Sequence, residues 1–326
     1  MISRRPTMFS VLNCIIAVLI FGCSDDGLDS PTENFEFHPL LSSYQIFAGN
    51  PADLVPSANF HLYEISNQLF TDYAHKQRLI YVPLNTSMIA IDEDLPDFPN
   101  GTIFVKTFFY YNDNRDTGKG KKIIETRLLI KHDTKWNTST YLWNDTQGDA
   151  VLLTTSLTKT INWIDENSKP RVIAYHIPGK RECATCHNAS SSIVPIGPKM
   201  RNLNIDVVRN DQIVNQLNHL QNIDVLAPCD PASFTTVTKW TDVTVPLSDR
   251  ARAYLDINCS HCHKHGGKAE STDLLLGFTE LFQNTGIAEK KDDIKGSMEK
   301  GEMPLLGTTI IDEEGLALIK TYVENL

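Results

Sequence analysis

The chain has 326 residues, of which 41% are hydrophobic and 21% are charged, and its formal net charge is −10. This composition is ordinary for a globular protein and excludes a largely disordered chain. The acidic balance argues against nucleic acid as a partner, because phosphate backbones are bound by excess lysine and arginine.

The first 22 residues form a leader that differs from the rest of the chain. Arg4 and Arg5 precede an apolar run over 11–21, which is too short to span a bilayer and is typical of a secretory signal peptide. The leader ends at Gly22-Cys23, which resembles the lipobox of bacterial lipoproteins; an uncleaved leader with an incidental cysteine is the alternative. We expect cleavage after residue 22 and lipidation of Cys23, which would export the protein and anchor it to a bacterial membrane, facing the periplasm or the surface.

A polar, acidic stretch over 23–34 follows and predicts a flexible tether. Beyond it, residues 35–177 predict a β-rich domain, because β-branched and aromatic residues recur in short runs. The candidate strands cover 78–82, 102–111, 123–131, 138–143 and 172–176. A polar loop with two glycines at 112–121 can return the chain as a hairpin. The aromatic strand before this loop fits the core of a sandwich or barrel.

Short helices and loops are predicted from residue 178 onward. One helix is expected over 207–220, a second begins at 247–250 with Ser248 as its N-cap, and a third covers 312–325. The third helix places apolar side chains on one face, as expected of a helix that packs on a core.

One cysteine motif occurs twice in this region. C-x-x-C-H is the attachment signature of c-type haem, because two thiols on one turn can each add to a haem vinyl group while the next imidazole lies beneath the iron. Histidine is 10 of 326 residues, so both histidines would follow by chance about once in a thousand cases. The motif pair therefore predicts two covalently bound haem c groups. The two copies comprise Cys183, Cys186 and His187, and Cys259, Cys262 and His263.

Other cysteine chemistries fit this pattern less well. The interval between Cys186 and Cys259 is longer than a zinc ribbon normally uses. A thioredoxin-like pair needs a βαβ setting, and an iron–sulfur cluster fits the spacing no better. Cys229 stands alone and is expected to be a half-buried free thiol.

Methionine is the expected distal ligand of the second iron. Met303, followed by Pro304, lies about 40 residues after His263, as in a small cytochrome c domain. Met298 competes for this role, and a methionine that only fills the core is the alternative for Met303.

The distal ligand of the first iron is less clearly marked. Met200 follows His187 by 13 residues and is the first candidate. His176 and His219 are alternatives, and an open or water-bound iron is another.

These features predict an α+β fold. A β-rich, sandwich or barrel-like domain over 35–177 would be followed by a mainly α-helical, cytochrome c-like region over 178–326. Within that region, 178–245 would carry the first haem and 246–326 the second.

Several segments outside the cysteine motifs strengthen this interpretation. The chain resembles a family of bacterial diheme c-type cytochromes from about residue 35 to its end, which implies electron transfer. Family members often have a second proline after the Met-Pro pair, where this chain has Leu305. The matching segments cover 69–76, 97–102, 124–129, 141–144, 196–199, 201–204 and 250–255.

Two other functions compete with an electron carrier that serves redox partner proteins in the envelope. One is a diheme peroxidase-like or oxidase enzyme with an open iron; the other is a β-rich binding module whose haems only report redox state. Removing the two leader arginines from 30 basic residues leaves 28 against 40 acidic ones, or −12, which suits a basic partner. Polar residues of the β-rich domain can form either a site or a charge network. They are Asp72, Lys76, Glu125 and Arg127.

Overall fold

A computed structural model describes residue 1 and residues 35–326 of the chain. The predicted signal peptide beyond Met1, the lipidation site Cys23 and the tether at 23–34 lie outside the described residues. Within the described part, no helix combines the length and apolar character that a membrane span requires.

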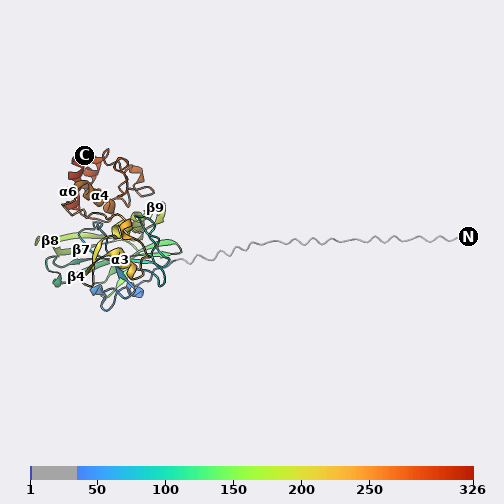
Figure 1. The fold of residues 1–326 in the computed structure, drawn as a ribbon. Coiled ribbons are helices and arrows are strands. Elements are labelled where there is room, and N and C mark those ends of the chain that lie inside the picture. The colour runs from blue at the N-terminus through green and yellow to red at the C-terminus, as the bar shows by residue number, and fades with distance from the viewer. Residues whose placement is uncertain (2–34) are drawn as a thin grey trace. The chain divides into compact units, whose positions relative to one another are not determined.

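A six-stranded antiparallel sheet with its strands in chain order is the largest element of the fold (Figure 1). A separate hairpin of β7 and β8 follows it. All five predicted strands are present, with ends that differ by a few residues, and the predicted hairpin loop joins β3 to β4. The strands are β1 (His61–Leu62), β2 (His75–Tyr81), β3 (Ile103–Tyr111), β4 (Lys121–His132), β5 (Lys135–Trp143), β6 (Ala150–Leu152), β7 (Leu157–Ile164) and β8 (Pro170–Ile177).

Alternation along β3 shows how the sheet is covered. Val105 is fully buried on one face, in a cluster with Leu41 from the segment that precedes β1. Phe108 is fully buried on the other face, where it clusters with Trp163 and Tyr175 of the β7–β8 hairpin. The expected sandwich or barrel is therefore wrong: one face of an open sheet is covered by the β7–β8 hairpin and by chain that follows it, and the other face by irregular chain that precedes β1.

The prediction of a mainly α-helical region over 178–326 is also wrong. The described chain is β-rich with antiparallel sheets, and short hairpins and loops separate the helices of its C-terminal half. The helices are α1 (Lys180–Cys186), α2 (Met200–Leu203), α3 (Gln216–Asn222), α4 (Leu247–Asn258), α5 (Lys291–Glu299) and α6 (Glu313–Glu324). The hairpins pair β9 (Asn188–Ala189) with β10 (Ser192–Ile193), and β11 (Asp206–Arg209) with β12 (Gln212–Asn215).

The predicted helix over 207–220 is the clearest error within this region. Its first half forms the β11–β12 hairpin, and only its end is helical, as α3. Asn210 and Asp211 adopt φ values of 51° and 60°, the left-handed region that a tight hairpin turn requires and that these residue types tolerate. Val208 and Ile213 pair across the hairpin and are exposed, so they form no buried helix face.

The last three helices pack around one apolar cluster, as expected for the end of the chain. Ala251 and Leu255 of α4 meet Ile319 of α6 in this core. A Cβ at Gly315 would overlap the Tyr254 ring, so glycine permits α6 to cross α4 closely. This crossing agrees with the prediction that the last helix packs on a core.

Candidate haem sites

The first cysteine motif lies on α1, which packs against β5. Cys183 is buried against the sheet, with its Sγ 3.6 Å from Thr140 Oγ1. The Glu182 carboxylate accepts a hydrogen bond from the Gly179 amide at 2.8 Å and lies 2.8 Å from His176 Nε2. These contacts fix the start of α1 over the sheet.

His187 follows α1 directly and is oriented by the backbone. Its Nδ1 lies 2.8 Å from the Val194 carbonyl oxygen, to which it can donate, so Nε2 is left for a metal. Burial lowers the pKa of His187 to about 4. A neutral imidazole is the form that binds iron.

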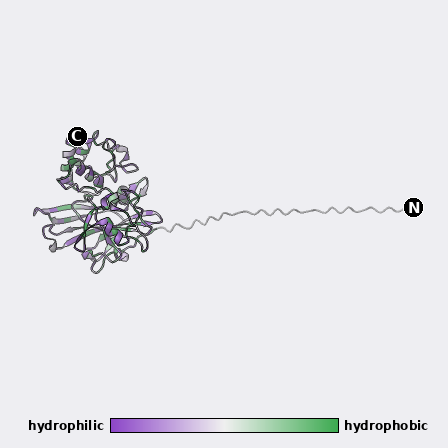
Figure 2. Cartoon of the chain, viewed as in Figure 1, coloured by the Kyte–Doolittle hydropathy of each residue, from purple (hydrophilic) through white to green (hydrophobic). Residues whose placement is uncertain are grey.

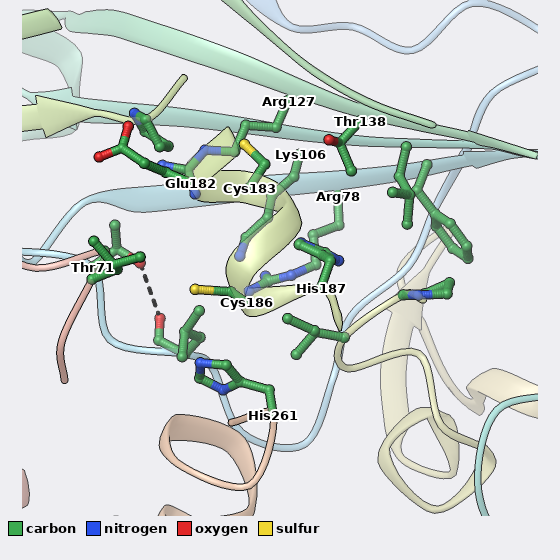
Figure 3. A pocket seen from close by; sticks show the side chains of 18 of the residues that line it. Thr71, Arg78, Lys106, Arg127, Thr138, Glu182, Cys183, Cys186, His187 and His261 are labelled. Atoms are coloured by element: carbon green, nitrogen blue, oxygen red, sulfur yellow. Dashed lines mark hydrogen bonds between the residues drawn. The ribbon is translucent and has the colours of Figure 1, made fainter. Parts of the chain in front are cut away.

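The first cavity, of about 120 Å³, lies between the sheet, α1 and the second motif (Figure 3). Cys183, Cys186 and His187 border it, as does His261 from the opposite side. Its apolar walls include Tyr63, Phe104, Leu129, Ile196 and Ile257. Three cations from the sheet also face it, namely Arg78, Lys106 and Arg127.

The second motif begins where α4 ends, because Cys259 is the C-cap of that helix. His263 Nδ1 lies 3.1 Å from Thr272 Oγ1, and that hydroxyl donates to the Ala269 carbonyl at 2.7 Å. The hydroxyl therefore accepts a hydrogen bond from Nδ1, and His263 Nε2 remains available. Both histidines thus show the second-partner contact typical of metal-bound imidazoles.

The second cavity, of about 350 Å³, is larger and more apolar. Leu255, Leu274 and Leu276 line it. Met298 and Met303 both border this cavity; Met298 is 9% exposed and Met303 is 40% exposed. Burial raises the pKa of the Cys259 thiol to about 12, so this group stays protonated. At both motifs, two thiols on one turn and a free imidazole nitrogen beside an apolar cavity fit haem c.

The two motifs meet, although more than seventy residues separate them in the sequence. The side-chain ligand atoms of Cys186, His261 and Cys262 all lie within 4.8 Å of one another. His261 borders both cavities, and its buried Nδ1 has no hydrogen-bond partner among residues 35–326. We did not predict a role for His261, although it is one of the two variable residues of the second C-x-x-C-H. The three residues could also supply three ligands to a zinc ion.

Other predicted site residues lie elsewhere. Met200 is fully buried in a cluster with Met88 and Leu203 and borders neither cavity, and His219 borders neither cavity as well. His176 borders the first cavity but pairs with Glu182. Cys229 is half-buried and borders neither cavity.

The polar residues of the β-rich part have structural contacts. Buried Glu125 accepts hydrogen bonds from Arg127 at 2.6 and 2.9 Å and from the Tyr175 hydroxyl at 2.7 Å. Buried Asp72 accepts hydrogen bonds from the backbone and hydroxyl of Thr309 and from the Ile310 amide. Asp72 thereby ties the loop before β2 to the segment that leads into α6.

The two candidate sites are built in the same way. Each motif has its own helix, its own oriented histidine and its own cavity. Comparisons with protein-family models, with curated proteins and with solved structures found no match to this chain.

Proposed function

We propose that the protein is a diheme c-type cytochrome that transfers single electrons. The observation that carries this proposal is the meeting of the two C-x-x-C-H motifs. Cys186 and Cys262 are the second cysteines of their motifs, and their sulfur atoms lie within 4.8 Å of each other. Attachment at these two sulfurs would bring the edges of two haems together, as transfer between them requires.

The chain's own residues provide binding, orientation and shielding. Haem iron, when bound, supplies reversible one-electron oxidation and reduction. His187 and His263 would hold the haem iron through Nε2, because Val194 and Thr272 engage Nδ1. Met303 would supply the distal ligand of the second iron, and Met298 is the alternative.

An enzyme with an open iron is the second candidate. No methionine of residues 35–326 borders the first cavity. Besides His187, the imidazole at this cavity without a carboxylate partner is that of His261, because His176 pairs with Glu182. A first iron without a distal side chain could take a small ligand, as in a diheme peroxidase or oxidase.

Spectra of the haem-loaded protein distinguish these two functions. The carrier predicts two six-coordinate low-spin haems that bind neither carbon monoxide nor peroxide. A high-spin component that binds either ligand would overturn the carrier and favour the enzyme.

Export and lipid anchoring remain part of the proposal. They are supported by the leader before Cys23 and by the polar stretch that follows it. Cys23→Ser should release the protein from the membrane fraction and abolish lipid labelling, because the anchoring thiol is lost. Unchanged fractionation and labelling would contradict the anchor. If the protein is exported and anchored as proposed, its partners would be redox proteins of the cell envelope.

A further inference from the structure

Three cations form a row across the face of the sheet that borders the first cavity (Figure 3). Arg78 of β2 lies opposite Lys106 of β3, and Lys106 lies opposite Arg127 of β4. Like charges directly opposite one another on neighbouring strands repel. The row therefore costs stability unless negative charge offsets it.

Only one cation of the row has a carboxylate partner within the described part of the chain. Arg127 pairs with Glu125 at 2.6 Å. Arg78 is 6% exposed, and its Nη2 has no hydrogen-bond partner among residues 35–326. Lys106 makes no side-chain hydrogen bond or ion pair with any described residue, and its Nζ lies 5.0 Å from the centre of the Phe108 ring.

Within the described part of the chain, the neighbouring rows of the sheet offer Arg78 and Lys106 no ion-pair partner. On one side Ile80, Phe104 and Leu129 form an apolar row at matching register. On the other side Lys76, Phe108 and Glu125 form a row, and the Glu125 carboxylate already accepts hydrogen bonds from Arg127 and Tyr175. Strands of this sheet carry hydrophilic as well as hydrophobic residues (Figure 2).

The other acidic group at this cavity is already engaged. Glu182 borders the cavity but bonds to the Gly179 amide and pairs with His176. Charges in such a poorly hydrated setting interact strongly, and an unpaired one is costly. The cavity therefore presents two basic side chains, Arg78 and Lys106, that pair with no carboxylate among residues 35–326.

We propose that Arg78 and Lys106 bind an anionic group, a carboxylate or a small oxyanion, inside the first cavity. A guanidinium suits the two oxygens of such a group, and an ammonium adds a point charge. This inference rests on the proposed function only for the haem beside the site. The anion has two sources: a propionate carboxylate of that haem, or a free anion from solution.

Arg78→Gln and Lys106→Gln, made in the full haem-loaded protein, test the site. Lys122→Gln, on an exposed position of β4, is the matched control. Arg78→Lys, which keeps the charge, should retain part of the effect. Thermal unfolding without added anion shows whether each variant folds, and Lys106→Gln carries the test if Arg78→Gln does not.

Two measurements separate the two sources. If the anion is a propionate, the propionate bending band in the resonance Raman spectrum moves in both variants and not in the control. If it is a free anion, sodium formate or sodium sulfate raises the unfolding temperature of the unaltered protein saturably. The apparent Kd should then rise at least tenfold in both variants.

An unchanged Raman band together with no saturable response would overturn the proposal. If intact mass instead showed no covalent haem, the proposed function would fail by itself. Formate and sulfate titrations would still decide the anion site, because saturable binding that the variants weaken supports it and its absence rejects it.

Discussion

The two cavities contain the same cysteine motif in different surroundings. A polar sheet face with three cations forms one wall of the first, and the second lies among apolar helices with two methionines. In both, a local hydrogen bond orients the histidine. If haem is bound as proposed, the motif would supply attachment and the proximal ligand by itself, whereas the cavity walls would decide the distal ligand and the local charge. Axial ligand and surrounding charge are the features by which proteins tune haem potentials.

The largest expected effect is a difference between the two regions in how far their folding depends on bound haem. The double substitution of Cys259→Ala and Cys262→Ala should remove one haem. Backbone amides of α4, α5 and α6 should then lose protection from hydrogen exchange, because the small core of these helices surrounds a cavity of about 350 Å³. Cys183→Ala with Cys186→Ala should remove one haem but leave the sheet folded, since clusters cover both of its faces. Intact mass counts the haems, and amide hydrogen exchange reports protection.

Cys229→Ala is the control for these pairs and should retain both haems. Loss of protection in the sheet after the first pair of substitutions would contradict the contrast between the regions.

The distal ligand of the second iron gives the next effect. Met303→Ala should abolish the sulfur-to-iron charge-transfer band at the red end of the oxidised spectrum, because the thioether is lost. Met303→His should keep the haem and lower its potential, since imidazole favours ferric iron more than a thioether does. If the band survives in Met303→Ala but disappears in Met298→Ala, the ligand is Met298.

The contact between the loop before β2 and the segment that leads into α6 should contribute less to stability. Asp72→Asn replaces one acceptor oxygen by an amide donor that faces the donors of Thr309 and Ile310. Asparagine tolerates the φ of 47° at this position, so the backbone is not strained further. We expect a loss of about 1–3 kcal/mol in the free energy of unfolding, measured with urea. Asp206→Ala, at an exposed position, is the control and should change little.

A further effect is a pH dependence of the stability of the sheet. Burial and then the charges of Arg78 and Arg127 lower the pKa of Lys76 to about 7, while Asp72 and Asp312 oppose this shift. An unfolded lysine titrates near pH ~10.4, so between about pH 7 and pH 10 the unfolded state binds more protons. The free energy of unfolding should therefore rise with pH across this window. Below about pH 7 the cost of burying charged Lys76 should be fully present.

Lys76→Met should flatten that slope, whereas Lys122→Met at an exposed position should not. Urea unfolding at a series of pH values measures both variants. An equal slope in Lys76→Met and in the unaltered protein would contradict the claim that the lowered pKa of Lys76 causes the pH dependence.

Local patterns predicted much of the fold. The strands were recognisable because β-branched and aromatic residues recur with turn residues between them, and α4 and α6 because of their apolar faces. The predicted N-cap Ser248 is wrong, because α4 begins at Leu247 and Ser248 makes no capping hydrogen bond. The β11–β12 hairpin was missed because its four apolar residues also fit a helical period, and only the turn at Asn210 and Asp211 distinguishes the two.

Features that depend on long-range register could not be predicted. Arg78, Lys106 and Arg127 lie on three strands, and only the pairing of those strands brings them into one row. The meeting of Cys186 with Cys262 likewise depends on how the second motif folds against α1. Met200 was a candidate by spacing alone, and the core buries it elsewhere.

Intact mass spectrometry with metal analysis tests the central claim most directly. The protein would be expressed with the haem-attachment machinery and then denatured. Two haems should remain bound to each chain, because thioether bonds at Cys183, Cys186, Cys259 and Cys262 survive unfolding. A chain without haem that instead holds zinc, with the zinc lost in Cys186→Ala or Cys262→Ala, would contradict the claim.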